Sequence, residues 1–121
     1  MFTISVETRF QASHSLVLPD GSLEPSHNHD WLITAVLSSD KLNNTGIVTN
    51  FHEIREMLNK TVAHFEGKSL QQTDYFQKKN PSAENVAKYI YDKIKPQLPH
   101  GVKLQAIKVV EEPGCSAKFS E

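Results

Sequence analysis

Two segments with helical periodicity stand next to each other in the middle of this chain, and strand-like segments lie on both sides of them. Four segments have the alternation or the β-branched composition of strands: residues 2–16, 27–39, 102–112 and 115–121. In the first, Phe2, Ile4 and Val6 alternate with polar residues. Pro113 and Gly114 predict a hairpin turn between the last two segments.

The two helical segments cover residues 50–67 and 80–96. We expect Asn50 to cap the first and Gly67 to end it. For the second, Asn80 is the expected cap, with Pro81 at the first helical position. The order β-β-α-α-β-β predicts an α+β fold in which a four-stranded antiparallel sheet carries both helices on one face. Because such a sheet has free edges, we also expect a homo-oligomer.

The length and composition narrow the class of protein. A chain of 121 residues is expected to form a single domain over residues 1–121. The net charge of −1 gives no nucleic-acid footprint or membrane-surface patch, and no apolar run approaches the ~20 residues of a membrane span. With no secretory signal pattern at the start and one cysteine, a cytoplasmic protein is the expectation.

Three histidines stand at the predicted ends of the first two strands. His27 and His29 alternate with Asn28, so on a strand they point to the same face. The phase of the first strand places His14 on its apolar face if no bulge intervenes. If the strands are antiparallel neighbours, all three imidazoles converge, which is the pattern of a catalytic zinc site. The alternative for the doublet alone is a polar turn entering a strand.

Five stretches together resemble the 6-pyruvoyl-tetrahydropterin synthase / 6-carboxy-tetrahydropterin synthase family, which has the tunnelling fold. "FQASHSL" is similar to the family's F-x-A-x-H-x-L, "HNHDW" to its H-G-H-x-Y, and "TGIVTNFHEI" to its G-x-V-x-D-F segment. "NPSAENVAKYIYDKI" resembles N-P-T-x-E-N-x-A, and "VVEEPGCSAKF" resembles the V-x-E-T segment ending in A-x-Y. The five occur in the family's order over almost the whole chain.

The resemblance implies a zinc-dependent lyase or synthase acting on 7,8-dihydroneopterin triphosphate. It implies that His14, His27 and His29 hold Zn²⁺, which would polarise the side-chain oxygens of the substrate. It further implies that Glu111 accepts the paired N–H groups of the pterin, a geometry suited to a carboxylate. The remaining implications are a pocket lined by Ser82 and Glu84, and a hexamer built from two trimers.

The chain departs from the family pattern at two catalytic positions. No cysteine precedes the histidine pair, and Cys115, in the last hairpin, is expected to be a small buried residue. Glu24 instead fits the E-x-x-H-x-H variant of a third group, whose members resemble enzymes that give 6-hydroxymethyl-7,8-dihydropterin. Where the family has an Asp-His dyad, this chain has Glu66 and Gly67. Glu24 is therefore the predicted general base, with Glu66 in the place of the dyad aspartate.

Three functions are compatible with these residues. The zinc triad and Glu24 favour the lyase or synthase. The missing dyad histidine leaves open an enzyme of the same fold acting on another pterin or purine-like substrate. It also leaves open a pterin-binding protein that retains metal and pocket without chemistry.

Overall fold

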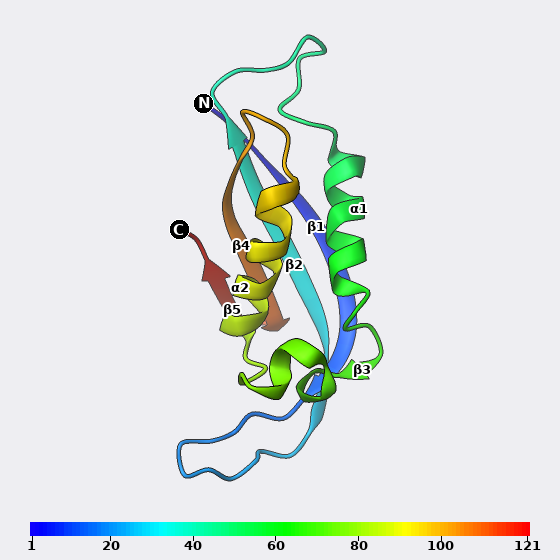
Figure 1. Ribbon diagram of the computed structural model, residues 1–121, viewed down its shortest axis with the longest axis vertical. Coiled ribbons are helices and arrows are strands. Elements are labelled where there is room, and N and C mark those ends of the chain that lie inside the picture. Colours follow the sequence, from blue (N-terminus) through cyan, green and yellow to red (C-terminus); the bar gives the residue numbers. More distant parts are fainter.

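The computed structural model describes residues 1–121 as one sheet with two α-helices on one of its faces (Figure 1). In chain order the elements are β1 (Phe2–His14), β2 (His27–Ser39), α1 (Phe51–Val62), β3 (Lys68–Ser69), η1 (Leu70–Gln72), η2 (Asp74–Gln77), α2 (Ala83–Ile94), η3 (Lys95–Gln97), β4 (Lys103–Glu112) and β5 (Cys115–Phe119). The strand order in the sheet is β3-β1-β2-β4-β5. None of the helices combines the length and apolar character that crossing a membrane requires.

The long hairpin of β1 and β2 is paired without interruption from one end to the other. Its register runs from Phe2 opposite Ser39 to His14 opposite His27. Because no bulge breaks either strand, alternate side chains keep one face throughout, as the sequence predicts. Val6 and Phe10 on β1 face the helices together with Trp31 on β2, and all three are buried.

The sheet has five strands, so the expectation of a four-stranded antiparallel sheet is wrong. The additional strand, β3, pairs in parallel with β1 at Ala12 and Ser13. It contains only two residues, Lys68 and Ser69, and such a short segment shows no periodicity that a sequence pattern could reveal. The backbone N–H of Gly67 leads into it by donating to the carbonyl of Gln11 at 2.7 Å.

The helix α1 begins as expected, with the Asn50 side chain accepting from the backbone N–H of His52 at 2.8 Å. It ends at Val62, earlier than Gly67 predicts. Its buried stripe includes Ile54 and Leu58, which pack into the core against the sheet.

The start of α2 differs from the expectation. The cap is Ser82, whose hydroxyl accepts from the N–H of Asn85 at 3.1 Å, and the helix begins at Ala83. Pro81 therefore lies before the helix, and Asn80 is not its cap. The Asn80 side chain instead bonds the backbone of Val17, in the loop between β1 and β2.

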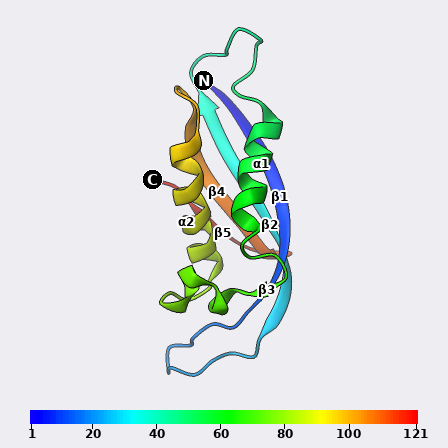
Figure 2. The same cartoon turned by 45° about the vertical axis from the view of Figure 1, so that its right-hand side comes forward.

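The two helices leave the opposite face of the sheet uncovered, as the turned view shows (Figure 2). On the covered side the core is aromatic toward the end of the sheet that carries the β1–β2 loop, where Phe10 stacks on Trp31 with ring centroids 5.7 Å apart. On the uncovered side charged residues stand in the strands, and Arg9 pairs with Asp30 at 3.2 Å. The hydrophobic core therefore lies between the sheet and the two helices.

Candidate functional site

Three imidazoles and one carboxylate converge at the end of the sheet where β1 and β2 meet their connecting loop, drawn at the bottom of Figure 1. His14 and His27 are direct register partners, and His29 lies opposite Ala12. One ligand atom from each histidine and one from Glu111 all lie within 4.8 Å of one another. The predicted convergence of the three histidines is thus present, on the helix-covered face.

Backbone carbonyls fix the orientation of two of the rings. Nδ1 of His14 lies 2.8 Å from the carbonyl oxygen of Pro81, and Nδ1 of His27 lies 3.0 Å from that of Pro25. A carbonyl oxygen can only accept, so each Nδ1 carries the proton, and in a neutral ring Nε2 presents a lone pair. The two Nε2 atoms are 2.9 Å apart. A cation between them removes the repulsion between these lone pairs, and such outer hydrogen bonds are typical of metal-ligating histidines.

His29 supplies the third nitrogen. Its Nε2 is buried and has no hydrogen-bond partner. Burial lowers the pKa of His29, an effect that nearby Glu111 partly offsets, so the ring favours the neutral form that binds metal. The indole of Trp31 packs edge-to-face against two of the rings, and its centroid lies 5.0 Å from that of His14 and 5.7 Å from that of His29. Three imidazoles beside this apolar side chain are a ligand set that fits Zn²⁺.

Glu111, near the end of β4, lies closer to the histidines than the sequence indicates. Its Oε1 is 3.2 Å from Nε2 of His14, and its Oε2 is 3.8 Å from Nε2 of His29. A carboxylate here can serve either as a further metal ligand or as an acceptor at the wall of the pocket. The family resemblance implies only the second role, and it is the pairing of β4 with β2 that brings Glu111 to the histidines.

A small pocket of ≈ 240 Å³ adjoins the histidine cluster. Glu111 lines it together with Ser82 and Glu84, the two residues expected to help form a pterin pocket. Cys115 also lines this pocket and is exposed, so the expectation that it is buried is wrong. Small apolar residues are usually buried, but Cys115 begins β5 directly after the hairpin turn, where its side chain is exposed.

Glu24 lies at the edge of the cluster. Its Oε1 is 3.9 Å from Nε2 of His27 and accepts the backbone N–H of Leu16 at 3.1 Å. Its side chain is 24% exposed, so the carboxylate is neither free in solvent nor sealed in the core. This places a carboxylate beside the candidate metal ligands, where the sequence predicted a general base.

Glu66 lies elsewhere. It is exposed, and its Oε2 accepts the backbone N–H of Gln11 at 2.8 Å, on the outer edge of β1. It is not one of the residues that converge with the histidines. Within one chain, then, the structure brings Glu24 to the cluster and leaves Glu66 outside it.

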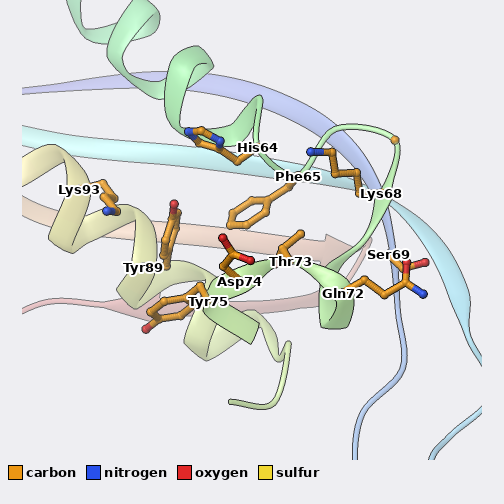
Figure 3. Close-up of a pocket in the computed structure, with 11 residues that line it drawn as sticks. His64, Phe65, Lys68, Ser69, Gln72, Thr73, Asp74, Tyr75, Tyr89 and Lys93 are labelled. Atoms are coloured by element: carbon orange, nitrogen blue, oxygen red, sulfur yellow. The ribbon is translucent and has the colours of Figure 1, made fainter. Parts of the chain in front are cut away.

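A larger cavity, of ≈ 880 Å³, opens in a different place, between the end of α1, the segment 67–75 and α2 (Figure 3). The side chains of Tyr75, Tyr89 and Asp74 face it, with Lys68 and Lys93 at opposite sides. None of the histidines of the cluster lines it. The candidate site is therefore the smaller pocket, because convergent ligand atoms and an unpartnered buried nitrogen indicate chemistry more directly than size does.

Comparisons with known proteins identify a family and similar structures. The model of the family described as 6-pyruvoyl tetrahydropterin synthase matches residues 3–121. A 6-carboxy-5,6,7,8-tetrahydropterin synthase of Rickettsia conorii is 23% identical, over 88% of this chain and 91% of its own. The 6-pyruvoyl tetrahydropterin synthase of Caenorhabditis elegans superposes with a TM-score of 0.86 at 18% identity, over 99% of this chain and 95% of that chain.

A second similar structure is a variant of the Plasmodium vivax 6-pyruvoyltetrahydropterin synthase in which a glutamate, described as a catalytic residue, is replaced by alanine. It superposes with a TM-score of 0.75 at 14% identity, over 99% of this chain and 97% of that chain. The family model covers nearly the whole sequence. The chain belongs to the 6-pyruvoyl tetrahydropterin synthase family.

Proposed function

We propose that this protein is a zinc-dependent lyase that cleaves the side chain of 7,8-dihydroneopterin triphosphate to give 6-hydroxymethyl-7,8-dihydropterin. The observation that carries the proposal is the position of Glu24, whose carboxylate lies 3.9 Å from Nε2 of His27. Residues 15–26 contain no thiol, so the carboxylate of Glu24 is the group beside the cluster that this loop offers as a general base. The catalytic glutamate of the Plasmodium vivax relative supports a catalytic role for a glutamate here.

His14, His27 and His29 would hold the metal, with Glu111 beside them. When bound, Zn²⁺ acts as a Lewis acid that favours deprotonation of the side-chain hydroxyls. The carbonyls of Pro81 and Pro25 fix the rings of His14 and His27 through Nδ1, which would leave Nε2 of each ring available to the metal, and Trp31 packs edge-to-face against His14. The chain's own contribution at this point is to orient the rings that would hold the ion.

Glu24 would take the proton from the C2′ hydroxyl of the substrate. The C1′–C2′ bond then breaks, C2′ becomes the aldehyde of the released triphosphorylated two-carbon fragment, and C1′ takes up a proton to become the hydroxymethyl carbon. Atoms and electrons balance without an oxidant or a reductant. The step needs a carboxylate near the cluster that is accessible to substrate, and Glu24 is half-buried.

Glu111 would accept the paired N–H groups of the pterin in the adjoining pocket, with Ser82 and Glu84 as further wall residues.

We further propose that the protein assembles as a hexamer of two trimers through the free edges of its sheet. The exposed strand β5 and the two-residue strand β3 form these edges. Light scattering of the purified protein tests the assembly, and a monomer at micromolar concentration contradicts it.

A pterin-binding protein without turnover is the second candidate. The observation that favours it is that Glu66 is engaged with the backbone of Gln11, and that Gly67 has no side chain to transfer a proton. Zinc-loaded protein incubated with 7,8-dihydroneopterin triphosphate, followed by mass spectrometry of the products, separates the two functions. We expect 6-hydroxymethyl-7,8-dihydropterin. A different pterin product contradicts the cleavage, and pterin that binds and is released unchanged establishes the binding protein.

A further inference from the structure

Side chains from three separate parts of the chain hold the segment that follows His14. The backbone N–H of Ser15 donates to Oε1 of Gln71 at 3.2 Å, and that of Leu16 donates to Oε1 of Glu24 at 3.1 Å. The N–H of Val17 donates to Oδ1 of Asn80 at 2.8 Å. Successive N–H groups of an extended segment point to opposite sides, so these side chains occupy both places where neighbouring strands would lie. The segment 15–17 is thus held largely by side chains, beside one isolated antiparallel bridge between Val17 and Leu23.

Asn80 forms the tightest of these attachments. Besides accepting from the N–H of Val17, its Nδ2 donates to the carbonyl oxygen of Val17 at 2.9 Å. Two bonds from one planar amide fix both the position and the direction of the residue that they hold. Asn80 is itself held, because its carbonyl oxygen accepts from Nδ2 of Asn85 on α2 at 2.9 Å.

Glu24 depends on the same segment. Its backbone N–H donates to the carbonyl of Leu16 at 3.0 Å while its carboxylate accepts the N–H of Leu16. The hydroxyl of Ser15 also donates to the carbonyl of Glu24. Leu16 immediately precedes Val17, so a shift of the segment at Val17 changes the place of the carboxylate of Glu24.

The residue that follows Asn80 contacts the histidine cluster. Pro81, directly after Asn80, supplies the carbonyl that holds Nδ1 of His14 at 2.8 Å. Pro81 therefore fixes His14, and Asn80 fixes the segment that holds the carboxylate of Glu24. Their position before α2, rather than in it, leaves the side chain of Asn80 and the carbonyl of Pro81 free for these bonds.

We propose that Asn80 is a positioning residue that sets the place of Glu24 relative to the histidine cluster, through Val17 and Leu16. This inference rests on the proposed role of Glu24 as the base. Asn80 lies away from the reacting atoms and acts only through the segment 15–17. Its loss should therefore affect the step that needs Glu24 and spare the binding of metal and pterin.

The first test is a double-mutant cycle in the zinc-loaded protein. We expect Asn80→Ala to lower kcat by about 10- to 100-fold, because a small displacement of a catalytic group has effects of this size. KM and zinc content should stay at the wild-type values. In a Glu24→Gln background the same substitution should change kcat by less than about 2-fold, because the residue it positions is already lost. An equal loss in both backgrounds, or a wild-type kcat for Asn80→Ala, overturns the proposal.

A milder variant guards against a folding defect. Asn80→Asp retains an acceptor for the N–H of Val17 and removes the donor to its carbonyl, so its kcat should also fall while its melting temperature stays close to that of the wild type. The matched control is Asn43→Ala, which releases a comparable side-chain-to-backbone turn at Thr45 and Ile47 in another loop. We expect this control to leave kcat unchanged. A wild-type kcat for a folded Asn80→Asp variant counts against the proposal.

Hydrogen exchange supplies a readout that does not depend on turnover. In Asn80→Ala the amide of Leu16 should exchange about 10-fold faster or more, because its protection depends on the fixed segment, while that of Phe10 in β1 stays protected. If the wild-type protein does not act on the pterin, the proposed function fails, and the exchange of Leu16 still decides whether Asn80 holds this segment. Unchanged exchange at Leu16 overturns the positioning role.

Discussion

His14 and His27 stand directly opposite each other in the β1–β2 ladder, and their Nε2 atoms are 2.9 Å apart. Each ring donates from Nδ1 to a backbone carbonyl, so in the neutral rings two lone pairs meet at this distance.

The first prediction concerns the metal. Purified protein should contain one zinc ion per chain, and the double variant His27→Ala/His29→Ala should contain almost none, because a single imidazole and a carboxylate cannot form the usual zinc coordination. Elemental analysis after dialysis measures the content. His52→Ala, which removes an exposed imidazole on α1, is the control and should retain the zinc. Equal zinc in the double variant and the wild type contradicts the site.

The second prediction concerns the base. Glu24→Gln should lower kcat by about 10²–10⁴-fold, the usual effect of losing a general base, and should retain zinc because glutamine has nearly the same size. Steady-state kinetics with 7,8-dihydroneopterin triphosphate measures the effect. Glu56→Gln, at an exposed position of α1, controls for the change in net charge. Wild-type turnover in Glu24→Gln shows that another group is the base.

The third prediction separates recognition from chemistry. Glu111→Gln should weaken pterin binding before it lowers kcat, since an amide presents one acceptor where the carboxylate presents two. Fluorescence titration with a pterin gives the dissociation constant. Because Glu111 also lies 3.2 Å from Nε2 of His14, zinc content must be measured in parallel. Loss of zinc with unchanged pterin affinity would show that Glu111 is a metal ligand and not a pterin acceptor.

The fourth prediction concerns stability at alkaline pH. Tyr91 is buried, and its hydroxyl donates to the carbonyl of Leu104 at 3.2 Å. Burial raises the pKa of Tyr91, and the carboxylate of Glu121 adds to this effect. The folded state therefore holds this proton more tightly than the unfolded state, whose tyrosines titrate near pH ~10, and its stabilising effect is lost as pH rises through the higher pKa.

Urea unfolding as a function of pH measures this loss. The free energy of unfolding of the wild type should fall above pH ~10, and that of Tyr91→Phe should fall less steeply, because phenylalanine has no proton to lose. Tyr75→Phe is the comparison, since Tyr75 is less buried and belongs to the cavity between the helices. Parallel curves for wild type and Tyr91→Phe contradict the assignment to Tyr91.

The convergence of the three histidines could be predicted because it depends on strand phase and on the antiparallel pairing of two consecutive strands. The apolar alternation that ends at His14 and the spacing of His27 and His29 are both visible in the sequence, and the β1–β2 hairpin contains no bulge. The contact of Glu111 with these rings could not be predicted. Between Val36 and Leu37 the pairing of β2 with β4 shifts its register, and a register that includes such a shift is set by packing rather than by pattern.

Asn80 shows how a local signal can be outweighed by a distant contact. Asparagine before proline at the start of an apolar helical pattern indicates a cap. Ser82, two residues later, is an equally good cap, and the helix uses it. What decides between them is Val17, more than sixty positions away in the chain (|i−j| = 63), whose backbone bonds Asn80. Contacts at this range leave no periodic trace in a single sequence.

The loop of residues 15–26 begins and ends at candidate metal ligands, because His14 and His27 close the same hairpin. Within this loop only the carbonyl of Pro25, at its end, hydrogen-bonds the ring of His27, so side chains elsewhere in the loop can change without altering the ladder register that places the imidazoles. The side chain that the loop presents to the cluster, here Glu24, is therefore set independently of the strands that carry the histidines. The strands of the hairpin position the candidate metal ligands, and the loop supplies the side chain next to them. One scaffold can therefore acquire different chemistries by changes in the loop.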